Sequence, residues 1–337
     1  MIGCGRSAHS YAVAIDSYSA MELSAVVDKN RAAARAFSDS FNCPYYTSLD
    51  EYISAGERFE CGVLCTPPAQ NIDIAIHLMQ RGINILCESP FAVDSASAQK
   101  MTDVSRTFGV QLMAGARFRY IADLIQARGL IQSGILGKIL VFEIDFRNFG
   151  DTDNYTGFWP DREMQGVIMD RGNHAIDIAR YFFGPIMRIR AEEAVKYKLS
   201  GLEDTVRLDM RSVSGVIGTA QLSRTLKNPR EDYIRIYGTR GTLCIGWKAS
   251  AYRLNGFADW TKFGEGFSKL RAVRRQIENL LHAIKDEATP ETTSEDGYEL
   301  VRALEAAYRS LSTKEWIELS TDPVARIERK FRVLRPA

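Results

Sequence analysis

Short apolar runs and segments of helical spacing alternate along the first third of the chain. The apolar runs cover residues 23–27, 61–65, 83–87 and 110–113. Between them, apolar residues three and four positions apart predict helices at 31–41, 71–81 and 95–108. Strands that are apolar throughout are covered on both faces, so this alternation predicts a βαβ arrangement around a mostly parallel sheet.

After a predicted helix at 121–133, the pattern changes to strands in which apolar and polar residues alternate. These strands are expected at 138–146, 187–195, 204–211, 216–224, 233–237 and 241–245. Alternation is typical of an antiparallel sheet with one packed and one wetter face. Further helices are expected at 170–183, 270–288 and 294–311. The 337 residues therefore predict an α/β protein of two domains, 1–118 and 119–337.

Composition and charge exclude several classes of protein. The chain has 43 Lys and Arg residues against 42 Asp and Glu residues, so its net charge of +1 has no general attraction for nucleic acid or an anionic membrane. No apolar stretch approaches the ~20 residues that cross a bilayer. The six cysteines lie mostly in apolar runs, where thiols act as small hydrophobes. We expect a cytoplasmic protein without a metal site.

A glycine motif stands at residues 3–8, which read Gly-Cys-Gly-Arg-Ser-Ala and lead into a helical stretch. Glycines let the backbone approach a pyrophosphate, and the helix N-terminus offers free N–H groups to it. Asp28 ends the next apolar run, where its carboxylate would bind ribose hydroxyls and repel a 2′-phosphate. The motif predicts a Rossmann domain that prefers NAD to NADP, a preference that Lys29 and Arg31 would soften.

The strand expected before these glycines is represented by Met1 and Ile2 alone. A strand of a parallel sheet normally has about five residues. Either the chain begins further upstream or the central strand is short, and a short strand would weaken cofactor binding.

Two predicted strands end in turns of unusual composition, residues 65–68 (Cys-Thr-Pro-Pro) and 87–90 (Cys-Glu-Ser-Pro). Ligands of open α/β sheets bind outside the carboxyl ends of the strands, so both turns should face the glycine motif. Turn formation alone explains the prolines about as well. Glu88 follows an apolar strand, where a carboxylate is costly unless it is used or paired, and we expect it at the cofactor.

The segment 170–177 carries three polar side chains at helical spacing. On a regular helix Asp170, His174 and Asp177 share one face. Such a group can bind a substrate hydroxyl, take its proton and orient the base. The alternative is a helix cap at Asp170 and a histidine held by an ordinary ion pair. The preceding segment, 155–162, is aromatic and charged, and its Trp159 is expected either to stack on a sugar ring or to pack as core.

Taken together, these residues resemble the Gfo/Idh/MocA oxidoreductase family. The resemblance extends over almost the whole chain. It rests on residues 3–6, 65–68, 88–90, 115–120, 133–138, 166–177 and 238–241 and on the closing helix before Trp316.

The resemblance implies a Rossmann domain followed by an α/β domain with a large open, mainly antiparallel sheet. It also implies pairing through that sheet, as a homodimer or homotetramer. The residues that it implies are Gly3, Gly5, Arg6 and Ser7 for the pyrophosphate, Asp28 for the ribose, Thr66, Pro67 and Asn71 for the nicotinamide side, and Asp170 and His174 for the substrate.

Two positions depart from the family pattern. The family's Glu-Lys-Pro motif would place a catalytic lysine at position 89, where this chain has Ser89. A serine hydroxyl can relay a proton or bind a hydroxyl, but it carries no charge to stabilise an alkoxide. Arg117 stands where the family more often has a small amide or polar residue, and it is a candidate for a compensating charge near the substrate.

The leading hypothesis is an NAD-dependent oxidoreductase that moves a hydride between the nicotinamide and a carbinol or ketone of a sugar, sugar nucleotide or cyclitol. His174 would accept the hydroxyl proton, Asp170 would position the hydroxyl, and Ser89 would act at most as a relay. The alternatives are a catalytically silent dinucleotide- or sugar-binding relative, and an enzyme whose transient redox step drives an elimination, epimerisation or glycoside cleavage.

Overall fold

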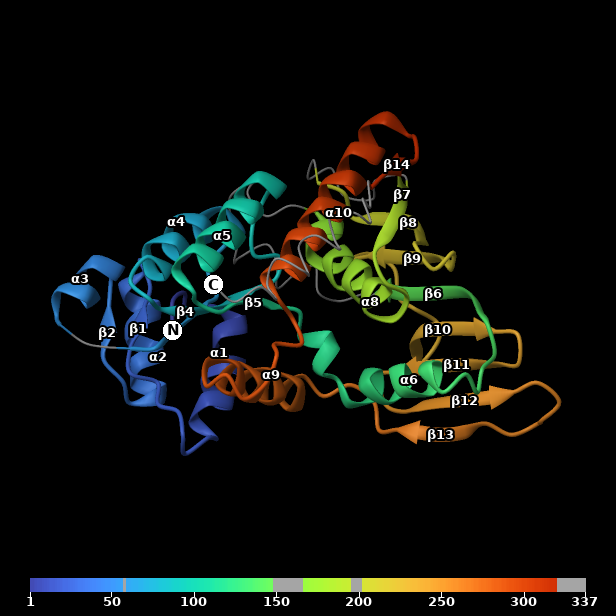
Figure 1. Ribbon diagram of the computed structural model, residues 1–337, viewed down its shortest axis with the longest axis horizontal. Coiled ribbons are helices and arrows are strands. Elements are labelled where there is room, and N and C mark those ends of the chain that lie inside the picture. The colour runs from blue at the N-terminus through green and yellow to red at the C-terminus, as the bar shows by residue number, and fades with distance from the viewer. Residues whose placement is uncertain (57–58, 148–165, 195–201, 320–337) are drawn as a thin grey trace, which may run out of the picture.

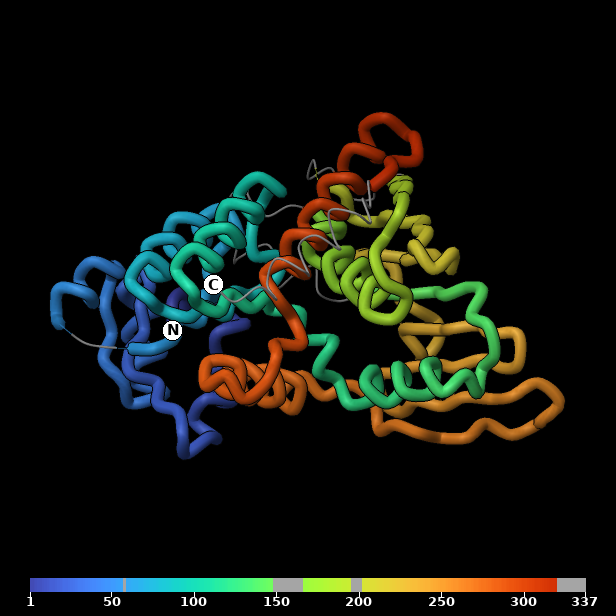
Figure 2. The backbone as a smooth tube through the Cα atoms, viewed as in Figure 1, coloured from blue at the N-terminus to red at the C-terminus, as the bar shows by residue number. Residues whose placement is uncertain are grey.

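The protein consists of two α/β parts with two long helices between them. The structure, a computed structural model, describes residues 1–56, 59–147, 166–194 and 202–319. In Figure 1 the N-terminal part lies on the left and a large sheet lies on the right. Helix α9 (Lys269–Ile284) packs against the first helix of the chain, and α10 (Ser294–Thr313) runs between the two parts, as the tube in Figure 2 also shows.

The N-terminal part is built on a parallel sheet. Its strands are β1 (Val26–Val27), β2 (Tyr45–Tyr46), β3 (Cys61–Leu64), β4 (Asn84–Glu88) and β5 (Leu112–Gly115). Ile2 forms parallel bridges to both Val27 and Leu64, and its N–H donates to Val63 O at 2.9 Å. Residues at the start of the described chain therefore fill the central position of the sheet.

Helices flank this sheet, as the sequence predicts for all of them but the short helix Leu49–Ser54. They are α1 (Arg6–Asp16), α2 (Arg31–Phe41), α3 (Leu49–Ser54), α4 (Pro68–Met79) and α5 (Ser95–Phe108). The bounds predicted for α2 and α5 agree with the structure because local caps set them. The Asn30 side chain accepts hydrogen bonds from the first turn of α2, and Asp94 does the same for α5.

The second part is a nine-stranded sheet in the order β13-β12-β11-β10-β6-β9-β8-β7-β14. The strands are β6 (Ile139–Arg147), β7 (Ile186–Glu193), β8 (Thr205–Ser212), β9 (Ile217–Ser223), β10 (Asp232–Gly238), β11 (Gly241–Gly246), β12 (Ser250–Leu254), β13 (Thr261–Gly264) and β14 (Ile317–Glu318). Among the strands that the structure describes in this sheet, only β6 and β9 pair in parallel, so the prediction of a mainly antiparallel sheet is confirmed. Strands β12, β13 and β14 were not predicted.

Helices cover one face of the large sheet. They are α6 (Ala122–Gln132), α8 (Asn173–Phe183) and α10, which lie in front of it in Figure 1. A 3₁₀ turn, η1 (Arg117–Tyr120), leads from β5 into α6. Within the described ranges, no helix is long and apolar enough to cross a membrane.

Candidate active site

The glycine turn leaves open space at the N-terminus of α1. Gly3 has a φ of +86°, and a Cβ there would lie 2.8 Å from the backbone carbonyl of Cys65, so only glycine fits. Gly5 is the N-cap of α1 without a side-chain cap, and a Cβ built on it meets nothing within 4 Å. The N–H groups of the first turn, which begins at Arg6 and Ser7, therefore face room for an anion.

Asp28 lies beside this turn, at the end of β1. Its Oδ2 accepts a hydrogen bond from the Cys4 N–H at 2.8 Å, and its Oδ1 accepts one from the Asn30 N–H at 2.8 Å. These bonds orient a partly exposed carboxylate toward the glycine turn. The residues present thus fit the pyrophosphate and ribose of a dinucleotide.

The turn after β3 is tied to the loop after β4. Thr66 Oγ1 donates to Asn71 Oδ1 at 2.6 Å, and Asn71 Nδ2 donates to the Phe91 carbonyl at 3.2 Å. Pro67 is the N-cap of α4. Asn71 is fully buried, so its contacts are those of a positioning residue, while Thr66 and Pro67 remain partly exposed.

A row of hydrogen bonds crosses the carboxyl ends of β4 and β5. The Tyr11 hydroxyl donates to Glu88 Oε2 at 2.6 Å, and Arg117 NH1 donates to Glu88 Oε1 at 2.9 Å. Arg117 NH2 lies 2.9 Å from Nε2 of His174, which belongs to α8. The side chains of Glu88 and Arg117 are 14% and 20% exposed, so a ligand can reach the row. The carboxylate is paired, as the sequence argument required.

His174 is held neutral in this row. Burial lowers its pKa well below the ordinary range, and the positive charges of Arg117 and Lys269 lower it further. The Phe118 ring lies 5.0 Å from the imidazole, between ring centroids. Because a guanidinium only donates hydrogen bonds, Nε2 of His174 must be the acceptor from Arg117.

The three residues of the expected cluster, Asp170, His174 and Asp177, bind different partners. Residues Ile168–Gly172 form a π-helical turn ahead of α8. Asp170 pairs with Arg224 at 3.3 Å, with 21% of its side chain exposed. Asp177, 4% exposed, pairs with Arg119 at 2.6 Å. Asp177 therefore belongs to a buried ion pair, and the shared face of the three residues stays a prediction.

The described part of the chain assigns no role to two further predicted site residues, Ser89 and Trp159. The Ser89 Oγ is buried and has no hydrogen-bond partner in the part of the chain that the structure describes. Trp159 and its aromatic segment lie outside the described residues.

Sequence reasoning missed Tyr11, Gln276 and Lys269. Tyr11 also donates to Gln276 Oε1 at 3.1 Å, and Gln276 is fully buried on α9. A polar residue on the inward face of an amphipathic helix was the available signal for Gln276. Nothing in the spacing indicated that α1 and α9, more than 250 residues apart in the chain, would meet at Glu88.

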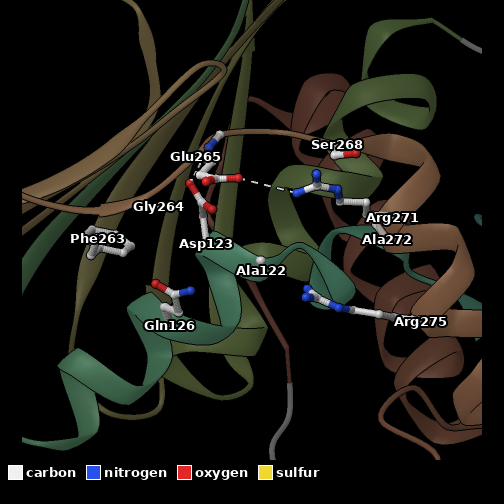
Figure 3. A pocket seen from close by; sticks show the side chains of 11 residues that line it. Ala122, Asp123, Gln126, Phe263, Gly264, Glu265, Ser268, Arg271, Ala272 and Arg275 are labelled. Atoms are coloured by element: carbon white, nitrogen blue, oxygen red, sulfur yellow. Dashed lines mark hydrogen bonds and ion pairs between the residues drawn. The ribbon is translucent and has the colours of Figure 1, made fainter.

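A cavity of about 260 Å³ lies on another side of α9, toward α6 and β13 (Figure 3). Asp123 at its floor accepts hydrogen bonds from Ser250 and from the Gly266 N–H at 2.8 Å. Arg271 at its rim pairs with Glu265 at 3.5 Å. None of Glu88, Arg117 and His174 lines this cavity, so it is separate from the row.

A glycine turn beside a row of ionisable groups, both at the carboxyl ends of parallel strands, defines a dinucleotide-dependent oxidoreductase. Comparison with known families agrees. Residues 1–116 match the oxidoreductase family with an NAD-binding Rossmann fold, and residues 124–244 match the GFO/IDH/MocA C-terminal domain. The chain belongs to the Gfo/Idh/MocA family and is an NAD(P)-dependent oxidoreductase.

Individual proteins resemble the chain over nearly its whole length. The rhizopine catabolism protein MocA of Rhizobium meliloti is 26% identical over 323 residues, which cover 93% of this chain and 94% of MocA. The D-apiose dehydrogenase of Paraburkholderia graminis is 23% identical, over 95% of this chain and 89% of the dehydrogenase. An oxidoreductase from Agrobacterium radiobacter, solved with NAD⁺, L-tartaric acid and magnesium, has the same fold, with a TM-score of 0.84, 18% identity and coverage of 94% and 96%.

Proposed function

We propose that the protein moves a hydride between a nicotinamide cofactor and a carbinol or ketone carbon of a sugar, sugar nucleotide or cyclitol. The observation that carries this proposal is the row Tyr11–Glu88–Arg117–His174 at the carboxyl ends of the parallel strands, which begins on α1, the helix that follows the glycine turn. The name of D-apiose dehydrogenase supports a sugar substrate.

In the proposed complex the cofactor accepts or gives the hydride when bound. Gly3, Gly5, Arg6 and Ser7 hold the pyrophosphate, and Asp28 holds the ribose. Thr66, Pro67 and Glu88 contact the nicotinamide side, and the buried Asn71 holds Thr66 in place. The carboxylate of Asp28 favours NAD over NADP, because a 2′-phosphate beside it would be repelled.

On the substrate side, Asp170 positions a hydroxyl and Arg117 supplies a positive charge near it. The partial exposure of both side chains supports these roles. Trp159 is proposed as a stacking surface for the sugar ring. Asp177 is left out of the proposed site because Arg119 already neutralises it in the interior.

Assembly and location are part of the proposal. In Figure 1 no helix of the described chain covers the face of the large sheet opposite α6, α8 and α10, which supports a homodimer or homotetramer formed through that face. All six cysteines are free thiols, which supports a cytoplasmic location.

Cofactor binding tests the proposal directly. NADH and NADPH are titrated against the full chain, and energy transfer from tryptophan to the nicotinamide is measured. Gly5→Asp should weaken binding at least about tenfold, since its carboxylate fills the space for the pyrophosphate and repels it. Gly129→Asp, on an exposed and open position of α6, is the control and should bind normally. Folded wild-type protein that binds neither cofactor would contradict the proposal.

A catalytically silent relative is the second candidate, and Ser89 favours it because a neutral hydroxyl stands where the family has a lysine. A screen of sugars and cyclitols with bound NAD separates the two. Turnover of any substrate rejects the silent relative.

A further inference from the structure

His174 is not free to take a proton. Its Nε2 lone pair accepts the hydrogen bond from Arg117, and in a neutral imidazole the other nitrogen then carries the proton. No lone pair is left on the ring for a substrate hydroxyl. The proton acceptor of the proposed reaction must therefore be another group near Arg117.

Lys269, the first residue of α9, lies on the side of that helix that faces the row. Residues three, four and seven positions later, Ala272, Val273 and Gln276, are all buried, so the helix presents one continuous inward face. Gln276 on this face contacts Tyr11, which donates to Glu88.

The residue before the N-cap of α9 anchors the same face at its other end. The Phe267 ring packs on the Phe118 ring at 5.4 Å between centroids, and Phe118 packs on His174 at 5.0 Å. Lys269 follows Phe267 by two residues and is partly buried. The packing of Phe267 thus brings the start of α9 to the row, where Lys269 is close enough for its charge to act on His174.

We propose that Nζ of Lys269 is the group that takes the proton from the substrate hydroxyl in the oxidative direction and returns it in the reductive direction. The inference rests on the proposed function and adds a residue to it. Lys269 lies on α9, 180 residues from position 89 in the sequence. A lysine there lets the chain dispense with one in its Glu-Ser-Pro turn.

The surroundings suit a lysine that must lose its proton. Burial lowers the pKa of Lys269, and the positive charge of Arg117 lowers it next. The ionisable groups that face it from the neighbouring elements are Arg117, Glu88, Arg6, Cys65 and His174. The cations outweigh the single carboxylate, so a larger fraction of the amine is neutral at a given pH than in an exposed lysine.

The step balances without a further reactant. As the substrate is oxidised, the neutral amine of Lys269 takes the hydroxyl proton on its Nζ lone pair and becomes an ammonium. The carbon loses its hydrogen with both C–H electrons to the cofactor, and a C=O bond forms. In reduction the ammonium returns the proton to the developing alkoxide.

Trace labelling with acetic anhydride tests the amine without cofactor or substrate. The pH dependence of acetylation at Lys269 in the full chain is read by peptide mass spectrometry, with an acetyl-lysine amide as the internal reference. We expect Lys269 to titrate below the ordinary value of 10.5. Titration at or above the reference would overturn the inference.

Steady-state kinetics test the role. Lys269→Met and Lys269→Arg should both lower kcat/KM by roughly 10²–10⁴-fold and flatten its rise with pH, while NADH affinity changes less than about threefold. Arginine keeps the charge but cannot give up its proton. Substantial activity in Lys269→Arg would overturn proton transfer in favour of a role for charge alone.

Arg271→Met is the matched control on the same helix turn, because Arg271 faces the separate cavity and is 72% exposed. It should keep wild-type kinetics. If Lys269→Met keeps the kcat/KM of the wild type and its pH dependence, the inference is overturned and the proposed function stays intact. Failure of folded wild-type protein to bind either NADH or NADPH would instead overturn the proposed function.

Discussion

Arg117 links the two chemical groups of the site. It donates to Glu88 on one side and to His174 on the other, at 2.9 Å in each case. A single guanidinium thereby pairs with a carboxylate and adds to the burial that keeps the imidazole uncharged. This arrangement is why His174 cannot be interpreted as the base from its position in the sequence alone.

Replacing Arg117 should release His174. In Arg117→Met the neighbouring positive charge is gone, so the pKa of His174 should rise toward its ordinary value of 6.5, with burial still holding it below. NMR titration of the imidazole Cε1 proton measures the change. Arg271→Met, which removes a charge on the far side of α9, should leave the titration of His174 unchanged. A His174 pKa that does not move in Arg117→Met would contradict the direct contact.

At the scale of elements, a buried ion cluster joins η1, α8 and α10. Arg119 NH2 lies 2.6 Å from Asp177 Oδ1 and 3.1 Å from Asp296 Oδ1. Arg180 approaches both carboxylates, at 3.8 and 3.4 Å. The cluster fixes η1, and with it Arg117, relative to α8, which carries His174.

Removing one charge from this cluster should destabilise the protein. Asp177→Asn leaves Arg119 with an incomplete set of partners in the interior, which typically costs about 3–5 kcal/mol. Urea unfolding followed by circular dichroism measures the loss. Glu299→Gln breaks a pair with Arg302 whose carboxylate is 36% exposed, and it should cost less than about 1 kcal/mol. Equal costs for the two variants would argue against a structural role for Asp177.

At the scale of the whole molecule, the row is assembled from both parts of the chain. Glu88 comes from the parallel sheet and His174 and Lys269 come from the second part, which α9 and α10 hold against the first. Because the buried imidazole of His174 at this junction is uncharged, the stability of the fold depends on pH.

Acid should destabilise the protein partly through His174. Its pKa is lower in the folded chain than in the unfolded chain, so the unfolded chain binds more protons below pH 6.5, and this share of the stability is lost as the pH falls. The loss is at most about 1.4 kcal/mol per pH unit. Urea midpoints at pH 7, 6 and 5 are compared for wild type and His174→Gln. The wild type should lose more stability than the variant, and parallel losses would refute the contribution.

Local pattern alone determined much of this protein. The spacing of apolar residues predicted the bounds of α2 and α5, and the structure shows why: the caps Asn30 and Asp94 fix each start from within a few residues. The glycine motif with Asp28 indicated the dinucleotide site for the same reason, since strand, turn and helix are consecutive in the chain.

The tertiary structure decided which side chains meet. Tyr11 reaches Glu88 across 77 residues and Gln276 across 265, distances over which periodicity shows that a face is buried but not what covers it. No local signal marked the π-helical turn ahead of α8, nor the partners of Asp170 and His174, which are Arg224 and Arg117 from other elements. Lys269 entered the site for the same reason as Gln276: the packing of α9 against α1 selected the partner of its inward face.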